Sequence, residues 1–381
     1  MFPISQYSIP AAVYRGGTSR GLLFHDKDLP EGKERQREIF LAGIDAYNPS
    51  QINGLGSGTS HTSKVMVIAP PTVDGADVDY TFYQIGIGEE VVDDEGTCGN
   101  LMSSVGAFSV DEGLVKTNSS DEFVTVSAFN RNIGKMIRME VPVVNGKAKV
   151  SGGYDMPGLV KTGAKIKVDI LSPGGGKTRH TLPLGSSGLV STEVKIYPAS
   201  FVDIVNPFVF VAASEFGLKG SELNSELATD EKLLAELESI RVKMALEAGM
   251  YSSVAEAKNA PAIPKIAIVA EPQDYVTSAG KMIKAQEVDI VAKMVSMHKF
   301  HRTFAGSGLY NLAASVLLKG TIPNQFFNKK DHGKEQLIRI GHPEGIAEVR
   351  VALTDDGSDV EFVGLDRTAR RIMKGDLYIP E

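Results

Sequence analysis

The chain has almost no cysteine: one residue, Cys98, in 381. A single thiol excludes a disulfide framework and any cysteine-rich zinc or iron–sulfur site formed within the chain. It also indicates a protein that works in a reducing compartment. We therefore expect neither a structural cross-link nor a bound metal, and a role for Cys98 has to be argued from its neighbours in the sequence.

Dense basic runs and long apolar runs are lacking as well. The formal net charge is −7 at pH 7, and no dense run of lysine and arginine makes a local exception, which disfavours nucleic-acid binding. No stretch is apolar enough over sufficient length to span a bilayer, and the first residues lack the basic and apolar segments of a secretory signal. We expect a soluble, cytoplasmic protein that binds neither nucleic acid nor membrane.

The length predicts two domains. A chain of 381 residues exceeds the size at which one hydrophobic core keeps growing, and 42 % hydrophobic residues suffice to fill two cores. The segment 157–188 is rich in Gly, Ser and Pro and is expected to connect the two halves. The expected domains are residues 1–160, completed by 364–381, and residues 161–363.

Local patterns predict mostly strands, with a few helices in each half. Short runs that are β-branched or alternate in polarity, bounded by Gly, Pro, Asn or Asp, predict strands. The expected strands are 9–14, 64–68, 78–87, 123–128, 136–141, 148–152, 166–171, 193–196, 207–212, 265–269, 338–340, 347–352 and 360–363. The expected helices are 31–47, 100–110, 230–247, 286–299 and 309–318. The apolar stripe of the 230–247 helix indicates core packing.

Each half contains a glycine-rich loop that leads into a helix of small residues. The first loop, 95–100, carries Cys98, and the second is 304–308. The unpaired backbone N–H groups at a helix start bind carboxylates and stabilise a thiolate. Two such helix starts facing each other would make a cleft that attracts anions. Cys98 is therefore a candidate acid–base thiol, and a small buried hydrophobe is the alternative.

These loops resemble those of the diaminopimelate epimerase fold. The resemblance rests on Cys98-Gly99-Asn100 opening a helix, Asn206-Pro207 after a strand, and Ala305-Gly306-Ser307-Gly308 opening another helix. It implies an α+β fold of two pseudo-symmetric domains, each a mostly antiparallel sheet wrapped around a central helix, with the active site in the cleft between them. The epimerase itself has a cysteine at both helix starts. Because Ala305 stands at the second start here, an amino-acid epimerase that uses two thiols is disfavoured.

Two further motifs resemble the PrpF family. They are the segment 54–64, which ends in Thr62-Ser63-Lys64, and the segment 14–21, which contains Gly17-Thr18-Ser19; shorter matches are 205–207, 341–343 and 367–370. Members of this family isomerise small unsaturated polycarboxylates such as aconitate, 2-methylaconitate, methylitaconate and oxalomesaconate. The resemblance implies a cofactor-independent isomerase of a small unsaturated di- or tricarboxylate, with Lys64 and Cys98 as the acid–base residues.

The chemistry of such an isomerisation suits these residue types. Removal of an allylic proton gives a dienolate, and a proton returns at the same carbon or at another. The base must be close and poorly solvated, and fixed donors must meet the developing negative charge. Lys64 can be that base, and Cys98 can transfer a second proton or shape the pocket. The structural alternative for Lys64 is a solvated lysine at a strand start.

Hydroxyl, amide and backbone N–H donors in the same motifs are the expected substrate contacts. Thr and Ser hydroxyls there can alternatively serve turns and caps. Arg15 and Arg20 can add positive potential, with at most one of them pointing inward. The predicted substrate-binding residues are Gly17, Thr18, Ser19, Asn53, Thr62, Ser63, Gly99, Asn100, Asn206, Gly306, Ser307 and Gly308.

Three other patterns in the sequence are not assigned to the active site. The run 174–178 imitates the end of a phosphate-binding loop, but Leu171 stands where the first glycine is required, so nucleotide binding is disfavoured. His298 and His301 have helical spacing, yet without further ligands nearby in the sequence, packing, capping or substrate contact is favoured over a metal. The acidic residues between 89 and 95 are expected to form a solvated loop.

A rival interpretation is a non-catalytic accessory protein that binds an aconitase-like enzyme or its product. The sequence leaves open which polycarboxylate is the substrate, and whether the net reaction is a cis–trans isomerisation or a double-bond shift. A homodimer and a functional link to an aconitase-like enzyme are further expectations about partners.

Overall fold

The computed structural model of the protein describes residues 5–327 and 333–380, and the chain forms two compact units. The first unit consists of residues 1–171 and 365–381, and the second of residues 172–364. The first unit thus includes strand β9 (Ile166–Leu171), which lies beyond the boundary expected at residue 160. It does so because β9 pairs with β7 (Lys135–Val144) of the same unit.

The strands of the first unit follow the order β21, β1, β2, β3, β4, β6, β7, β9. Among these described strands, the pairs β2/β3 and β4/β6 are parallel and the other neighbours are antiparallel. The bounds of the remaining elements are β1 (Gln6–Gly16), β2 (Ser19–His25), α1 (Lys33–Ile44), β3 (Lys64–Ala69), β4 (Val78–Ile85), β5 (Val92–Asp93), α2 (Met102–Asp111), β6 (Phe123–Asn130), β8 (Lys147–Ala148) and β21 (Ala369–Pro380).

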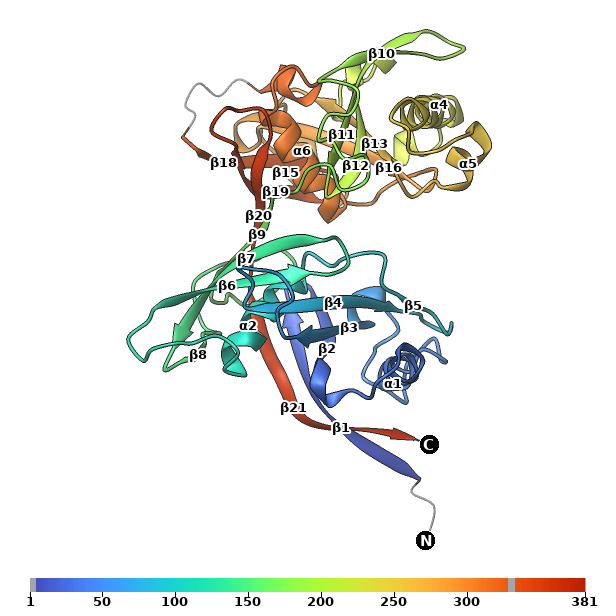
Figure 1. The fold of residues 1–381 in the computed structure, drawn as a ribbon. Helices are drawn as coiled ribbons and strands as arrows, with labels where there is room; N and C mark the ends of the chain where they lie inside the picture. The colour runs from blue at the N-terminus through green and yellow to red at the C-terminus, as the bar shows by residue number, and fades with distance from the viewer. Residues whose placement is uncertain (1–4, 328–332, 381) are drawn as a thin grey trace. The chain divides into compact units, whose positions relative to one another are not determined.

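The second unit repeats this order as β10, β11, β12, β13, β16, β18, β19, β20. Its parallel pairs, β12/β13 and β16/β18, fall at the same two places in the order. The two units therefore share one strand order and one pattern of parallel pairs, as the pseudo-symmetric prediction requires (Figure 1). They differ in the first strand of the order, which is the last strand of the chain in the first unit and directly precedes β11 in the second. The bounds are β10 (Gly188–Ser191), β11 (Ile196–Ile204), β12 (Asn206–Ala212), α3 (Asn224–Leu227), α4 (Glu231–Glu247), α5 (Val254–Asn259), β13 (Lys265–Ala270), β14 (Tyr275–Val276), β15 (Met282–Ile283), β16 (Ile290–Ser296), β17 (Lys299–Phe300), α6 (Gly306–Leu317), β18 (Glu335–His342), β19 (Gly345–Leu353) and β20 (Val360–Arg367).

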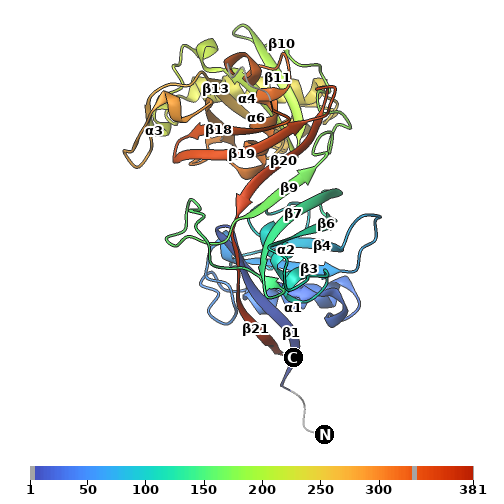
Figure 2. The ribbon, with the colours of Figure 1, turned by 90° about the vertical axis from the view of Figure 1, so that its left-hand side faces the viewer.

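A central helix lies among the strands of each unit. In the first unit α2 contacts β1, β6, β7, β9 and β21, and in the second α6 contacts β11, β12, β18 and β19 (Figure 2). Residues 102–110 of α2 and 308–316 of α6 are all buried. A helix covered on every side needs small or apolar residues nearly all round, which is why both helices consist mainly of Gly, Ala, Ser and apolar residues. The buried Asn311 of α6 donates to the carbonyls of Val202 and Asn206. The predicted α+β class, with strands wrapped around a central helix, is confirmed.

The helix predicted at 286–299 is wrong. The segment forms strand β16, which pairs with β13 on one side and β18 on the other, and then turns into β17. Residues 290–295 of β16 are buried, so both faces of the strand are covered. A strand buried on both faces loses the alternation that distinguishes it from a buried helix in the sequence.

Two predicted strands are also largely wrong. Of the segment 148–152 only Ala148 belongs to a strand, the short β8. Residues 193–195 form the turn between β10 and β11, and β11 begins at Ile196. The sequence prediction also missed β2, β10, β21, the short helices α3 and α5, and the two-residue strands β5, β14, β15 and β17. No helix in the described part of the chain is long and apolar enough to span a membrane.

Candidate active site

Lys64 is the first residue of β3, and its side chain is buried, with 8 % of the residue exposed. Its Nζ donates a hydrogen bond to Gln84 Oε1 at 2.5 Å and lies 5.0 Å from the centre of the Phe82 ring. Both partners are on β4, where Gln84 is the residue directly opposite Lys64 in the antiparallel register. The amine is therefore held inside the first unit and does not extend into solvent.

The amide of Gln84 has a fixed orientation. Its Nε2 donates to the backbone carbonyls of Ser63 at 2.8 Å and Ser60 at 3.1 Å. Because the NH₂ group is used by these carbonyls, the amide oxygen faces the amine of Lys64. The sequence prediction missed Gln84, since an ordinary strand glutamine becomes recognisable only once the β3/β4 register is known.

Cys98 is buried just ahead of α2, with 9 % of the residue exposed. Its thiol donates to Ser19 Oγ at 3.7 Å, and its carbonyl accepts the N–H of Met102 at 3.1 Å. This second bond has the spacing of a helical turn, so the Cys98 backbone is continuous with the start of α2. The acidic residues Glu89, Glu90, Asp93, Asp94 and Glu95 are exposed, as expected for a solvated loop.

Lys64 and Cys98 both contact one short segment at the start of β2. Ser19 accepts the thiol hydrogen of Cys98, while Gly21 lies against the backbone of Lys64. A Cβ placed on Gly21 would be 2.7 Å from the carbonyl oxygen of Lys64 and 2.9 Å from Cδ2 of Leu101. Only glycine therefore lets β2 approach both β3 and the residue that precedes α2. The fold in this way brings Lys64 and Cys98 to the same three residues of β2.

Beside Cys98, the side chain of Asn100 is hydrogen-bonded to Thr18 and Arg367, and Gly17 packs against it. The side chain of Asn100 donates to Thr18 Oγ1 at 3.0 Å and accepts from Arg367 Nε at 2.9 Å. Gly17 has φ +54°, and a Cβ there would lie 2.5 Å from Asn100 Oδ1. The hydroxyl hydrogen of Thr18, which is exposed, stays available to a ligand. The sequence prediction named Arg367 only as part of the 367–370 family motif and gave it no role in the site.

Arg15 and Arg20 use their guanidinium groups within the first unit. Arg15 donates to the carbonyl oxygens of Gly17 and Thr368 and to the Thr368 hydroxyl, and Arg20 donates to the carbonyl of Leu55. Burial, followed by the nearby charge of Arg370, lowers the pKa of Arg15. These contacts fix loops around the site.

The hydroxyls of the loop that precedes Lys64 bond mainly to the loop itself. Ser63 is fully buried and donates to the Thr59 carbonyl and to Gln51 Oε1, while Thr62 donates to the Thr59 carbonyl. The backbone N–H of Asn53 donates to Asp45 Oδ2. The structure thus gives Ser63 and Thr62 the turn chemistry that was their alternative interpretation, and it leaves the side chain of Asn53 exposed.

The predicted residues of the second unit gather at the start of α6. The first intrahelical bond runs from Leu309 N–H to the Ala305 carbonyl, so the N–H groups of Gly306, Ser307 and Gly308 have no acceptor within the helix. A Cβ on Gly308 would be 2.5 Å from the Phe208 ring, which makes glycine necessary there. The carbonyl of Asn206 accepts from the buried Asn311 at 2.8 Å.

The loop at 174–178 binds a carboxylate of its own chain. Asp203 Oδ2 accepts the backbone N–H groups of Lys177 and Thr178 and the Thr178 hydroxyl, at 2.7–2.9 Å. The amides that a phosphate would need are therefore already used.

His298 and His301 are not on a helix, contrary to the prediction. His298 lies in the β16/β17 turn with φ +61°, and His301 follows β17. Among the described residues no group of three His, Cys, Asp or Glu side chains is placed to hold a metal ion.

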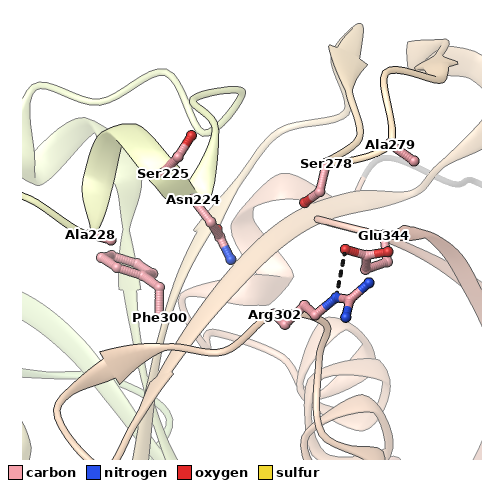
Figure 3. A pocket seen from close by; sticks show the side chains of 8 residues that line it. All are labelled: Asn224, Ser225, Ala228, Ser278, Ala279, Phe300, Arg302 and Glu344. Carbon is pink, nitrogen blue, oxygen red and sulfur yellow. Dashed lines mark hydrogen bonds and ion pairs between the residues drawn. The ribbon is translucent and has the colours of Figure 1, made fainter.

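A cavity of about 460 Å³ lies in the second unit, next to the segment that carries His301 (Figure 3). Arg302 and Glu344 form an ion pair of 3.3 Å beside it, and Asn224 donates to the carbonyl of His301 at 2.9 Å. Its lining residues are Asn224, Ser225, Ala228, Ser278, Ala279, Phe300, Arg302 and Glu344. Next to Glu344, burial lowers the pKa of His342 to about 4.

Comparison with known proteins places these features in a family. A family model described as PrpF protein matches residues 6–380. The chain is 38 % identical to 3-methylitaconate isomerase of Eubacterium barkeri, over 98 % of each chain, and 30 % identical to 2-methyl-aconitate isomerase of Shewanella oneidensis, over 100 % of this chain and 99 % of that protein. A crystal structure of methylitaconate-delta-isomerase superposes with a TM-score of 0.93, at 36 % identity, covering 99 % of this chain and 97 % of that chain.

Proposed function

Since this chain belongs to the PrpF family and is an isomerase, we propose that it isomerises a small unsaturated di- or tricarboxylate of the aconitate, 2-methylaconitate or methylitaconate type by allylic proton transfer. The observation that carries the proposal is the buried amine of Lys64, which is held by a neutral amide at 2.5 Å and, within residues 5–327 and 333–380, has no carboxylate as its hydrogen-bond acceptor. A carboxylate partner would add a negative charge beside the amine and favour its ammonium form, and the neutral amide of Gln84 adds no such charge.

In the proposed reaction Lys64, in its neutral form, removes an allylic proton. The electron pair of the broken C–H bond enters the conjugated system and gives a dienolate whose charge rests on a substrate carboxylate. A proton then returns to carbon. If the Lys64 ammonium returns it, the neutral amine is restored directly. If the Cys98 thiol returns it, the thiolate regains a proton and the Lys64 ammonium loses one, both by exchange with solvent, before the next turnover. Protonation at a different carbon shifts the double bond, while protonation at the original carbon after rotation gives the cis–trans product.

The donors around Cys98 suit the charge that develops. The free hydroxyl hydrogen of Thr18 and the N–H groups of Gly99 and Asn100 at the start of α2 can bind a carboxylate and stabilise the dienolate. The start of α6 offers the same chemistry through Gly306, Ser307 and Gly308. Their contacts with substrate stay a prediction, as do the cytoplasmic location and the link to an aconitase-like enzyme.

The test is proton exchange followed by NMR. The purified protein is incubated in deuterated water with cis-aconitate, 2-methylaconitate or methylitaconate. We expect isomerisation with deuterium incorporation for at least one of them. In Lys64→Ala both should fall by about 10²-fold or more, since that is the usual contribution of a positioned base.

Lys265 provides a matched control. It opens β13, the strand that corresponds to β3, and its Nζ donates to the carbonyl of Ala262. Like Lys64, it is a lysine at the first position of a strand flanked by one parallel and one antiparallel neighbour. Lys265→Ala should keep activity. Undiminished exchange in Lys64→Ala would overturn the assignment of the base, and tight binding by the unaltered protein without any exchange would favour the accessory protein.

A further inference from the structure

Two asparagines at the turn between β6 and β7 bond to the loop that precedes α2. Asn130, the last residue of β6, is fully buried, and its Nδ2 donates to Thr97 Oγ1 at 2.8 Å. Asn132 Nδ2 donates to the carbonyl of Asp94 at 2.7 Å. In the part of the chain that the structure describes, residues 94–97 make no other hydrogen bond to a residue outside the loop. The segment that leads into the thiol is therefore attached to the first unit through these two side chains.

The same two side chains are bonded to β4. Asn130 donates its second N–H to the Tyr80 hydroxyl at 2.8 Å. Asn132 accepts the backbone N–H of Phe82 at 2.8 Å and donates to the Phe82 carbonyl at 2.9 Å. The ring of Phe82 lies 5.0 Å from the amine of Lys64. The two asparagines thus join the loop of the thiol to the strand against which the amine packs.

Every polar group of the two side-chain amides has a partner. Asn130 Oδ1 accepts the backbone N–H of Asn132 at 3.0 Å, so each amide oxygen has a donor and each NH₂ group has two acceptors. The N–H of Phe82 fixes the orientation of the Asn132 amide, because a reversed amide would place two donors together. A polar network in which each member is satisfied holds its elements rigidly.

From this network we propose that Asn130 and Asn132 are positioning residues for the proton transfer at Cys98. The inference rests on the proposed function, in which the thiol returns a proton to carbon. That step needs the sulfur within hydrogen-bond reach of the carbon, and a displacement of about 1 Å can cost about 10²-fold in rate. The network keeps the loop of the thiol at a fixed place relative to the strand that holds Lys64.

The single cysteine of the chain gives a direct measure of this positioning. Reaction with 5,5′-dithiobis(2-nitrobenzoate) reports on Cys98 alone. Thr97→Val removes the acceptor of the Asn130 amide and keeps the shape of the side chain. We expect the labelling rate to rise by about 10-fold, the usual effect of one lost hydrogen bond on a local opening equilibrium. Asn130→Ala should give at least the same rise, and Thr97→Ser, which keeps the hydroxyl, should react like the unaltered protein.

Arg131 provides the control for a general loss of stability. It lies between the two asparagines, and its Nε donates to Asp79 Oδ2 at 2.9 Å, away from the loop. Arg131→Ala should lower the free energy of unfolding in urea titrations without changing the labelling rate. Unchanged labelling in both Thr97→Val and Asn130→Ala would overturn the proposal. An equal rise in Arg131→Ala would overturn it as well, since stability alone would then explain the effect.

Steady-state kinetics and deuterium exchange relate the positioning to the reaction. Thr97→Val should lower kcat for isomerisation by about 10-fold with little change in KM, while exchange at the carbon deprotonated by Lys64 continues. Thr97→Ser should restore kcat. Faster labelling of Thr97→Val at unchanged kcat would refute a role in proton transfer. Absence of turnover in the unaltered protein would refute the proposed function, and the labelling rates would still decide whether the network positions the thiol.

Discussion

Lys64 and Gln84 face each other across the β3/β4 ladder, joined by a hydrogen bond of 2.5 Å from the amine to the amide oxygen. The second function of the Gln84 amide, donation to the Ser63 and Ser60 carbonyls, prevents it from turning its NH₂ group to the amine. The position of the proposed base is thus set by a neutral neighbour that is itself held by the loop leading into β3.

The charge of that neighbour should control the pH dependence. In Gln84→Glu a carboxylate replaces the amide and stabilises the ammonium form of Lys64, so we expect activity at neutral pH to fall by about 10-fold or more. The rising limb of the pH–rate profile should also move to higher pH. Gln84→Met removes the hydrogen bond without adding charge and should lower kcat without moving the profile. If both variants gave the same profile, the neutrality of Gln84 would not be the reason for its role.

Cys98 is predicted to return the proton and not to remove it. In Cys98→Ala we expect net isomerisation to fall by about 10²-fold while deuterium exchange at the carbon deprotonated by Lys64 continues. The control is Ser104→Ala, which removes a buried side chain in α2 whose hydroxyl bonds to the Leu101 carbonyl, and it should retain both activities. Simultaneous loss of exchange and isomerisation in Cys98→Ala would instead assign the thiol to the first proton transfer.

Gly17 should be intolerant of a side chain. Alanine at φ +54° is strained, and its Cβ would lie 2.5 Å from Asn100 Oδ1, displacing the amide that joins Thr18 to Arg367. We expect Gly17→Ala to lower the free energy of unfolding by about 1–3 kcal/mol and to raise KM. Gly96→Ala is the control, because a Cβ there meets nothing within 4 Å, and it should change stability by less than about 0.5 kcal/mol. Denaturant unfolding and steady-state kinetics measure the two effects.

His342 should make stability depend on pH. Burial lowers its pKa from 6.5 to about 4, with a further lowering by His301 and an opposing effect of Glu344. Because the unfolded chain binds the proton more readily, this contribution to stability is present above pH 6.5 and is lost as the pH falls to 4, by roughly 1–3 kcal/mol. His342→Gln should flatten the stability curve between these values in urea titrations. An unchanged slope would show that other groups cause the acid sensitivity.

Several elements could be predicted from the sequence because their signals are local. The short apolar strand Lys64–Ala69, which Pro70 follows directly, and the helix Glu231–Glu247, capped by Asp230, have patterns that need no knowledge of distant residues. The β16 segment could not be predicted in this way, because its neighbours β13 and β18 bury both faces and no Gly or Pro between residues 281 and 305 marks where the strand begins or ends. The edge strand β21 was missed since its exposed, charged sequence resembles a loop until β1 pairs with it.

The same distinction between local and tertiary information applies to the candidate site. Motifs in the sequence identified Lys64 and Cys98 as candidates, together with the glycine loops that open both central helices. This was possible because loops and helix starts are determined by residues that follow one another in the sequence. The tertiary structure alone determined that Gln84 accepts a hydrogen bond from the amine of Lys64 and that the hydroxyl of Ser63 bonds within its own loop. It also brought Asn100 to Arg367, which is more than half of the chain away in sequence. Such partners depend on strand register and on which faces become buried, and these are properties of the whole fold, so no local stretch of residues specifies them.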